Sequence, residues 1–202
     1  MADVLLIGSA NPDKARELVE LMAGLPWEVR SLKDYPAVEE PEETGTTFEE
    51  NALLKARYYS AHFGVACVAD DSGLEVDALD GAPGVYSARY AGEHCSYDDN
   101  NEKLLDALEG VPWHERTARF RCCAALVIPG EAEFHVESGT VEGYIAAIIE
   151  GDQGFGYDPL FVPRGEEITF GQMTPAEKHK ISHRGRAFKQ MRAYLEKRHG
   201  AN

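Results

Sequence analysis

Residues 66–73 of this chain read Ala66-Cys67-Val68-Ala69-Asp70-Asp71-Ser72-Gly73. An apolar run ends abruptly in two adjacent acids, a hydroxyl and a glycine. This order is typical of a buried strand, here residues 65–69, that delivers carboxylates to the edge of a sheet, where a divalent cation can bind. Because neighbouring carboxylates repel each other, one of them is expected to need a metal, a hydrogen-bond partner or a raised pKa. The stretch therefore predicts an acidic site at the end of a strand.

A strand, a turn and a helix are predicted at the start of the chain. Residues 4–7 form a short apolar strand, followed by a turn of small residues that leads to Lys14. Asn11 suits the N-cap, and Pro12 the first position, of a helix that runs to about Gly24. The unpaired amides and the dipole of this helix would face the turn, which makes the turn a candidate anion site. It matches neither a Walker loop nor a dinucleotide fingerprint, so an ordinary strand–helix connection remains the alternative.

The rest of the chain alternates between helical and strand patterns. Thr47 and Glu50 fit a capping box that begins a second helix, on which Asn51 and Lys55 share one face. Its buried face is expected to carry Phe48, Ala52, Ala56 and Tyr59. Further elements are expected at residues 74–79 (extended), 98–108 (helix), 117–128 and 133–144 (an antiparallel strand pair), 160–162 (strand) and from 174 (helix start), with a basic helix to about residue 198. No internal repeat or linker is evident, so we expect a single domain over residues 1–202.

Composition excludes several classes of function. The 202 residues are 44% apolar, which is enough for one sizeable core or for two lobes that share a sheet. The formal charge of −15 argues against general binding to nucleic acid or to an anionic membrane, and no apolar run approaches the roughly 18 residues of a membrane span. Residues 178–198 nevertheless carry eight Lys or Arg against one acid, which indicates either an anionic ligand or a solvated helix face. Four cysteines with no C-x-x-C pair and no signal peptide predict reduced thiols and a cytosolic, hence cytoplasmic, location.

Six segments together resemble one family of enzymes. They are Ser9-x-Asn11-x-x-Lys14; Glu43-Thr44-Gly45-x-Thr47-Phe48-x-Glu50-Asn51-Ala52-x-x-Lys55-Ala56; Asp70-Asp71-Ser72-Gly73-Leu74; Gly81-Ala82-Pro83-Gly84-Val85-Tyr86-Ser87-Ala88-Arg89-Tyr90; Gly154-Phe155-Gly156-Tyr157-Asp158-Pro159; and Lys178 with Ser182-His183-Arg184-Gly185. With these segments in order, the chain resembles the inosine/xanthosine triphosphate pyrophosphatase family from residue 4 to about residue 188. One such motif is a weak signal, whereas six in register are a strong one.

The resemblance implies a fold and a reaction. The fold is α/β: a long, twisted, mixed β-sheet flanked by helices, with two lobes and a nucleotide cleft between them. The reaction is Mg²⁺-dependent hydrolysis of deaminated purine nucleoside triphosphates, ITP, dITP, XTP and dXTP, to the monophosphate and pyrophosphate. This activity keeps such nucleotides out of DNA and RNA. The resemblance also implies that the protein is a homodimer. Its ligand would be a small nucleoside triphosphate, and it would not bind nucleic acid directly.

Residue roles follow from the same resemblance. Asp71 would bind the metal ion and accept the proton of the attacking water, with Glu42 as the second carboxylate unless Glu43 takes its place. Asp70 would be a further metal ligand or would orient Asp71. The implied substrate contacts are Ser9, Ala10, Asn11, Pro12, Asp13, Lys14 and Lys55 for the phosphates, Ser72 for the sugar or phosphates, and Phe155, Gly156, Tyr157, Asp158, Lys178, His183 and Arg184 for the base. Phe155 lies between glycines, which suits either a base-stacking plate or a plug in the core.

Two departures and three alternatives accompany this interpretation. Ser9 stands where the family commonly has threonine, and residues 150–153 read Glu-Gly-Asp-Gln where Arg and Asn are frequent. The hydroxyl is kept, but the added acid bears on triphosphate affinity and base preference. The alternatives are a pyrophosphatase for other modified nucleotides, a non-catalytic nucleotide-binding regulatory module, and a metal-dependent phosphomonoesterase. The adjacent acids argue against the binding module, because a pure triphosphate binder gains little from clustered negative charge.

Overall fold

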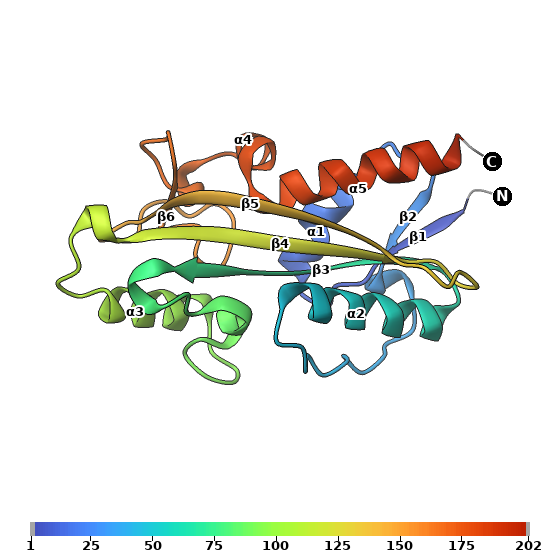
Figure 1. The fold of residues 1–202 in the computed structure, drawn as a ribbon, viewed down its shortest axis with the longest axis horizontal. Helices are drawn as coiled ribbons and strands as arrows, with labels where there is room; N and C mark the ends of the chain where they lie inside the picture. Colours follow the sequence, from blue (N-terminus) through green and yellow to red (C-terminus); the bar gives the residue numbers. More distant parts are fainter. Residues whose placement is uncertain (1–2, 201–202) are drawn as a thin grey trace. The chain divides into compact units, whose positions relative to one another are not determined.

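The structure, a computed structural model, describes residues 3–200 (Figure 1). Its strands are β1 (Val4–Ile7), β2 (Glu28–Ser31), β3 (Ala66–Val76), β4 (Thr117–Val127), β5 (His135–Ile145) and β6 (Phe161–Pro163). They are hydrogen-bonded in the order β2-β1-β3-β4-β5-β6. Because β1 is parallel to β2 and β3 whereas β6 is antiparallel to β5, the sheet is mixed, which confirms the predicted α/β fold with a mixed sheet.

Helices connect and flank these strands. The α-helices are α1 (Pro12–Met22), α2 (Phe48–Phe63), α3 (Tyr97–Ala107), α4 (Pro175–Ile181) and α5 (His183–His199). Shorter 3-10 helices are η1 (Leu32–Asp34), η2 (Asp77–Leu79), η3 (Gly84–Arg89), η4 (Trp113–Glu115) and η5 (Phe170–Gln172). Over residues 3–200 the structure contains no helix with the length and apolar character needed to cross a membrane.

The described chain forms two compact units. The first unit consists of residues 3–71, 122–139 and 185–200, and the second of residues 72–121 and 140–184. The strands β3, β4 and β5 each contribute residues to both units. The expectation of a single domain over residues 1–202 stays a prediction.

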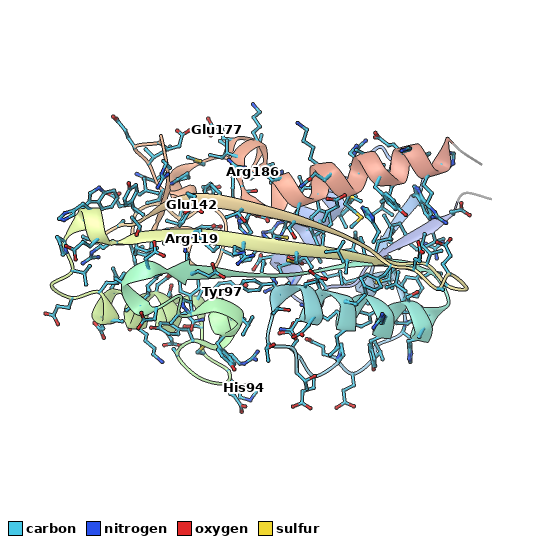
Figure 2. The ribbon with its side chains drawn as sticks, in the orientation of Figure 1. His94, Tyr97, Arg119, Glu142, Glu177 and Arg186 are labelled. Carbon is cyan, nitrogen blue, oxygen red and sulfur yellow. The ribbon has the colours of Figure 1, made fainter. Side chains whose placement is uncertain are left out.

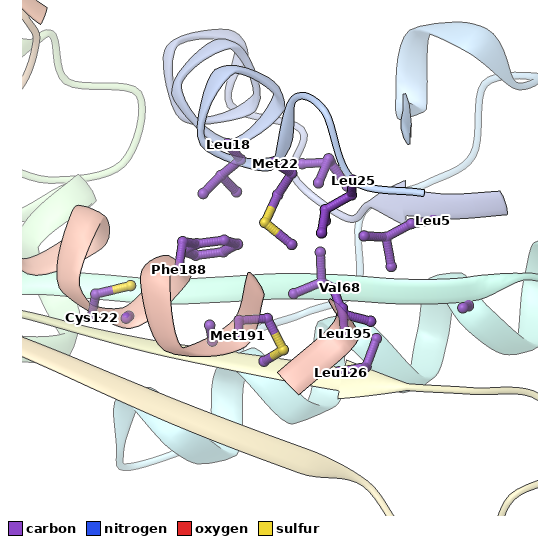
Figure 3. Close-up of a cluster of buried hydrophobic side chains, with 14 residues drawn as sticks. Leu5, Leu18, Met22, Leu25, Val68, Cys122, Leu126, Phe188, Met191 and Leu195 are labelled. Carbon is purple, nitrogen blue, oxygen red and sulfur yellow. The ribbon is translucent and has the colours of Figure 1, made fainter. Parts of the chain in front are cut away.

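The core of the first unit follows from the alternation of side chains along its parallel strands. One buried cluster contains Leu5, Ile7, Leu18, Met22, Ala66, Val68, Cys122, Phe188, Met191 and Leu195 (Figure 3). Its members come from β1, β3 and β4 and from the helices α1 and α5, so one face of the strands is covered by these two helices. Each large side chain buried in this way stabilises the fold by about 1.5–3 kcal/mol.

The alternate positions of the same strands face a different helix. Leu6 of β1 and Cys67 of β3 form a smaller cluster with Tyr59 of α2. Gly8 continues this face, because a Cβ atom there would lie 2.7 Å from Cys67 Sγ and 3.0 Å from the Tyr59 ring. Along β3, the even-numbered positions 66 and 68 therefore face α1 and α5, while position 67 faces α2.

Helix boundaries confirm the capping predictions. Asn11 Oδ1 accepts hydrogen bonds from the backbone amides of Asp13 and Lys14, at 2.9 and 3.1 Å, and Pro12 begins α1. Thr47 and Glu50 form the capping box of α2, which ends at Gly64 in a left-handed conformation. The two N-terminal ends form as predicted because the donors and acceptors of each cap lie within four residues of each other.

The second unit has its own core and a charged strand surface. Its buried cluster contains Leu74, Val76, Leu104, Leu108, Phe120, Tyr157, Leu160, Phe161 and Phe170. Arg119 of β4 lies beside Glu142 of β5 (Figure 2), and its Nε donates to Glu142 Oε2 at 3.1 Å. The Arg119 guanidinium also donates to both carboxylate oxygens of Asp77, and this bonding lowers the pKa of Asp77 below its usual range.

One strand prediction was wrong, and one strand was missed. The strand predicted to end at residue 69 continues to Val76, so Asp70 and Asp71 lie inside β3 rather than beyond its end. Lys14 lies 3.8 Å from Asp70, and Asn51 and Lys55 donate to Asp71, so charged or polar groups from two helices accompany the acids inside this strand. The short strand β2 was not predicted, because its sequence Glu-Val-Arg-Ser offers one apolar side chain and no run of alternation.

Candidate active site

Asp71 is the buried centre of a polar cluster in the first unit. Its side chain accepts a hydrogen bond from Asn51 Nδ2 at 3.1 Å and another from Lys55 Nζ at 3.4 Å. Asn51 and Lys55 are four residues apart on α2, so they present their polar ends to the same carboxylate. Gly45 packs directly against this pair, because its amide donates to Asn51 Oδ1 at 2.8 Å and a Cβ atom there would lie 2.5 Å from that oxygen.

Burial and charge oppose each other at this carboxylate. Burial raises the pKa of Asp71, and the charges of Lys55 and Lys14 offset only part of this effect. Burial also acts to lower the pKa of Lys55, but the charges of Asp71 and Glu43 outweigh it and raise that pKa to about 12. Lys55 is therefore a permanent positive charge near neutral pH, while Asp71 is a carboxylate of increased basicity. Such a pair can take up a proton at the acid and stabilise negative charge at the amine.

Glu43, rather than Glu42, approaches this cluster from the loop before α2. Lys55 Nζ donates to Glu43 Oε1 at 2.6 Å, whereas Glu42 is exposed to solvent. The sequence left both glutamates open as the second carboxylate. The geometry favours Glu43 as the neighbour of Asp71, and the role of either glutamate as a metal ligand stays a prediction.

The donor set of the cluster fits a divalent cation. Asp71 and Glu43 share the single ammonium of Lys55, so the three groups together carry an excess negative charge on hard oxygen atoms. Within residues 3–200, no group of three or more His, Cys, Asp or Glu side chains is arranged to hold a metal ion. Mg²⁺ does not require such a group, because it is usually bound by one or two carboxylates together with substrate phosphates and water.

The turn from Ser9 to Lys14 leads into α1. Ser9 is buried and donates from Oγ to the backbone carbonyl of Asn11, at 3.5 Å. Ala10 and Pro12 are exposed, and Asp13 pairs with Arg16 at 2.9 Å. The Asp13 and Lys14 amides are bound to the Asn11 cap, so the Lys14 ammonium is the group by which this turn presents positive charge.

Asp70 lies next to Asp71 in the sequence but has different neighbours. Its Oδ2 is 3.8 Å from Lys14 Nζ of α1 and 3.8 Å from Cys122 Sγ of β4. Its side chain is fully buried, whereas that of Lys14 retains 17% exposure. Asp70 thus lies closest to a lysine of α1 and Asp71 to one of α2, while the charge of Asp70 also acts on Lys55 and that of Lys14 on Asp71.

The second unit gathers the candidate base-binding residues around a buried ion pair. Lys178 Nζ donates to Asp158 Oδ2 at 2.6 Å, and each side chain is only 3% exposed. The same oxygen accepts from the backbone amide of Phe155 at 2.8 Å, which fixes the loop that carries this aromatic ring. Gly154 has a φ of +75°, and a Cβ atom there would lie 2.1 Å from Asp158 Oδ2, so only glycine fits.

Positive charge surrounds the Phe155 ring. Lys178 Nζ lies 5.0 Å and the Arg184 guanidinium carbon 5.4 Å from its centroid. Arg184 also donates to Ser72 Oγ at 2.9 Å, so these four predicted substrate contacts form one group. Because the ring is partly exposed and packs against charged groups, it does not act as a simple plug of the core.

His183 and Tyr157 are held by aromatic and backbone contacts. The His183 ring stacks on Phe120 with centroids 4.7 Å apart and an interplanar angle of 14°. Tyr157 is buried, and its hydroxyl donates to the carbonyl of Ser87 at 2.8 Å. The Tyr157 side chain is thus part of the packing of the second unit, whereas Gly156 beside it is partly exposed.

Sequence reasoning missed two aromatic residues near these groups. Phe120 supports His183, and Tyr97 lies with its ring centroid 5.9 Å from that of Phe155. Phe120 follows the alternation of an ordinary buried strand, so its sequence carries no separate signal. Tyr97 is the first residue of α3 and is 39% exposed. The sequence alone shows only an aromatic residue near the start of a predicted helix, which is a weak signal.

Comparisons with known proteins identify close relatives. A model of the Ham1 family matches residues 5–194. A dITP/XTP pyrophosphatase of Bacillus subtilis is 48% identical over 191 residues, which cover 95% of this chain and 96% of that protein. A HAM1 protein of Coxiella burnetii has a similar structure, with a TM-score of 0.87 and 38% identity over 98% of this chain and all of that one. A nucleoside-triphosphatase and dITP/XTP pyrophosphatase of Mycobacterium abscessus has a TM-score of 0.73 and 49% identity over 93% of this chain and 97% of that one.

Proposed function

The chain belongs to the Ham1 family, and we propose that it hydrolyses deaminated purine nucleoside triphosphates to the monophosphate and pyrophosphate. ITP, dITP, XTP and dXTP are the substrates, and removing them keeps the deaminated bases out of DNA and RNA. The observation that carries this proposal is the buried carboxylate of Asp71, which accepts from Asn51 and Lys55 in the same cluster as Glu43. Water adds across the anhydride bond between the α- and β-phosphates, so one bond breaks and no oxidant or second substrate is consumed.

Asp71 carries the central role in this reaction. Its carboxylate takes the proton of the attacking water, and its raised pKa suits that task. Asp71 and Glu43, or Glu42 in its place, would hold the Mg²⁺ ion, which supplies charge neutralisation on the phosphate oxygens when bound. Ser9, Lys14 and Lys55 bind the triphosphate tail, and Lys55 keeps its charge throughout because its pKa is about 12.

Base selection is assigned to residues of the second unit. Phe155 stacks on the purine, with Gly156 and Tyr157 beside it in the loop, while Asp158, Lys178, His183 and Arg184 read the base edge. Hypoxanthine and xanthine carry a carbonyl at position six where adenine carries an amino group, so donors such as Arg184 favour the deaminated bases. A site without an acceptor for the exocyclic amine of guanine leaves that amine unpaired, at a cost of about 1–3 kcal/mol, or roughly one to two decades in affinity.

A substrate panel tests the proposed function. Steady-state kinetics on ITP, XTP, dITP, GTP and ATP, with product identification, should give the highest kcat/KM for the deaminated purines and pyrophosphate as the product. Release of orthophosphate, or equal rates on the common nucleotides, would contradict the proposal.

Removal of divalent metal should abolish turnover. We expect ITP hydrolysis to fall to background in excess EDTA and to return on addition of Mg²⁺, because the negative cluster of Asp71 and Glu43 must bind a polyanionic substrate. Pyrophosphate release measured at fixed ITP over a Mg²⁺ titration checks this. Full turnover in EDTA would rule out the metal-dependent mechanism.

Replacement of Lys14 by alanine should mainly weaken substrate binding. Lys14→Ala removes the positive group of the Ser9–Lys14 turn, and we expect KM for ITP to rise about tenfold, which corresponds to the loss of one charge-assisted hydrogen bond. Arg16→Ala is the matched control, because Arg16 lies on the same helix and pairs with Asp13 at the surface. An unchanged KM in Lys14→Ala would remove this residue from the phosphate site.

We further propose that the protein lies in the cytoplasm and, as the family resemblance implies, forms a homodimer. The four cysteines at positions 67, 95, 122 and 123 are free thiols, which supports a reducing compartment. Light scattering on the purified protein should give twice the mass of one chain at micromolar concentration. A mass of one chain at all concentrations would exclude the dimer.

A further inference from the structure

Asp70 and Asp71 face opposite sides of the strands of the first unit. Ala66 and Val68 of β3 belong to the cluster covered by α1 and α5, and Cys67 belongs to the cluster with α2. Because side chains alternate along a strand, Asp70 continues the first face and Asp71 the second. The contacts agree with this assignment, since Asp71 accepts from Asn51 and Lys55, both on α2.

The Asp70 carboxylate lies between a buried cysteine and the ammonium group of Lys14. Cys122, which lies 3.8 Å from Asp70 Oδ2 through its sulfur, is itself a member of the cluster shown in Figure 3. The same Oδ2 lies 3.8 Å from Lys14 Nζ. A carboxylate that is fully buried and flanked by a packed strand has little freedom to move, so it is a fixed anchor for the flexible lysine.

Lys14 needs such an anchor. It lies in the first turn of α1, where its charge opposes the positive end of the helix dipole and the helix would favour its turning away. The negative charge of Asp70, 3.8 Å from the ammonium, compensates this repulsion. At 3.8 Å the ion pair sets the direction of the ammonium without a short hydrogen bond that would hold it back from a phosphate.

We propose that Asp70 is a positioning residue, which orients the Lys14 ammonium toward the triphosphate and does not bind the metal ion. The inference rests on the proposed function, and it assigns to Asp70 a task different from both roles that the resemblance implied. Positioning of Lys14 by Asp70 favours substrate binding through entropy, because a lysine held in place beforehand loses less side-chain freedom when the substrate binds.

A double-mutant cycle tests the pairing of Asp70 with Lys14. Asp70→Asn, Lys14→Ala and the double variant are compared with the wild type for KM of ITP and for the Mg²⁺ concentration at half-maximal rate. We expect Asp70→Asn to raise KM about tenfold, the double variant to match Lys14→Ala within about twofold, and the Mg²⁺ requirement to stay within about twofold of wild type. The proposal is overturned if the two single changes multiply in their effects on KM, or if Asp70→Asn leaves KM unchanged. It is also overturned if adding Asp70→Asn to Lys14→Ala raises the Mg²⁺ concentration at half-maximal rate about tenfold.

A second variant decides the question if Asp70→Asn fails to fold. Lys14→Arg keeps the charge but replaces the compact ammonium by a longer, planar group that pairs with Asp70 in a different geometry. KM for ITP should rise at least about fivefold if the position of the charge matters, and a normal KM overturns the proposal.

Binding of inorganic pyrophosphate separates this inference from the proposed function. Calorimetric titration of the same four proteins with pyrophosphate and Mg²⁺ measures the coupling of residues 14 and 70 without any turnover. If wild type binds pyrophosphate with this coupling but does not cleave ITP, the proposed function fails while the positioning role stands. If ITP is cleaved and the coupling is absent, only the positioning role fails.

Discussion

Asp71→Asn lowers kcat for ITP hydrolysis at saturating Mg²⁺ by an expected factor of about 10³ or more, or roughly 4 kcal/mol in the activation barrier. The amide cannot accept the proton of the attacking water, and it is a poorer ligand for a hard cation than a carboxylate is. Asparagine has nearly the same shape, but only one of its two terminal atoms accepts, so the variant keeps the hydrogen bond from either Asn51 or Lys55 and loses the other. Pyrophosphate release in steady state measures the effect.

The control for this variant is a matching change at the surface. Asp106→Asn alters an exposed position on α3 and should leave kcat unchanged. Circular dichroism and thermal unfolding of both variants establish that each is folded. Turnover of Asp71→Asn within about threefold of wild type would refute the assignment of this residue as the base, because a general base contributes at least about a hundredfold.

Asp158→Ala should cost about 3–5 kcal/mol of unfolding free energy, because it leaves the buried Lys178 ammonium without its carboxylate. It also removes the acceptor of the Phe155 amide, so the loop that carries the predicted stacking ring loses its anchor. Urea denaturation, with the slope m compared between proteins, measures the loss. Substrate binding should fall in parallel, since both partners are predicted to contact the base.

An exposed ion pair supplies the comparison. Glu196→Ala breaks the pair with Arg192 on α5, where both side chains are substantially exposed, and should cost at most about 0.5 kcal/mol. The double replacement Asp158→Leu with Lys178→Met should recover much of the stability that Asp158→Ala loses, because an apolar pair carries no desolvation cost. If the double variant is as unstable as the single one, the uncompensated charge is not the cause.

Local rules predicted the N-terminal ends of α1 and α2 and the buried face of α2. The caps at Asn11 and Thr47 depend on groups within one helical turn, and they form as predicted. The strand β3 shows where local rules fail. An acidic pair within an extended segment resembles the end of a strand, yet here Lys14 and Lys55 approach from two helices and allow the strand to continue. Only the tertiary fold contains that information.

Part of the candidate site could likewise be predicted from the sequence, and part required the tertiary fold. The family resemblance assigned Asp71, Lys55 and Lys14 to one metal and phosphate site, and in the structure the charges of Lys55 and Lys14 act on Asp71. Spacing could not choose between Glu42 and Glu43, because a loop has no fixed period that assigns a face to each position. Nor could it separate the tasks of Asp70 and Asp71, since that separation requires knowing that both lie inside one regular strand.

The composition of the first core has a consequence for biosynthesis. Leu5 of β1 and Leu195 of α5 belong to the same buried cluster, although 190 residues separate them along the chain. The early strand can pack against α1 soon after synthesis, but its apolar face is not fully buried until residues 188–195 of α5 have been made, so the first unit completes its folding late. The second core draws its members from residues 74–181 and can close sooner. During synthesis the nascent N-terminal strands are thus the part of this protein most exposed to aggregation and to chaperones.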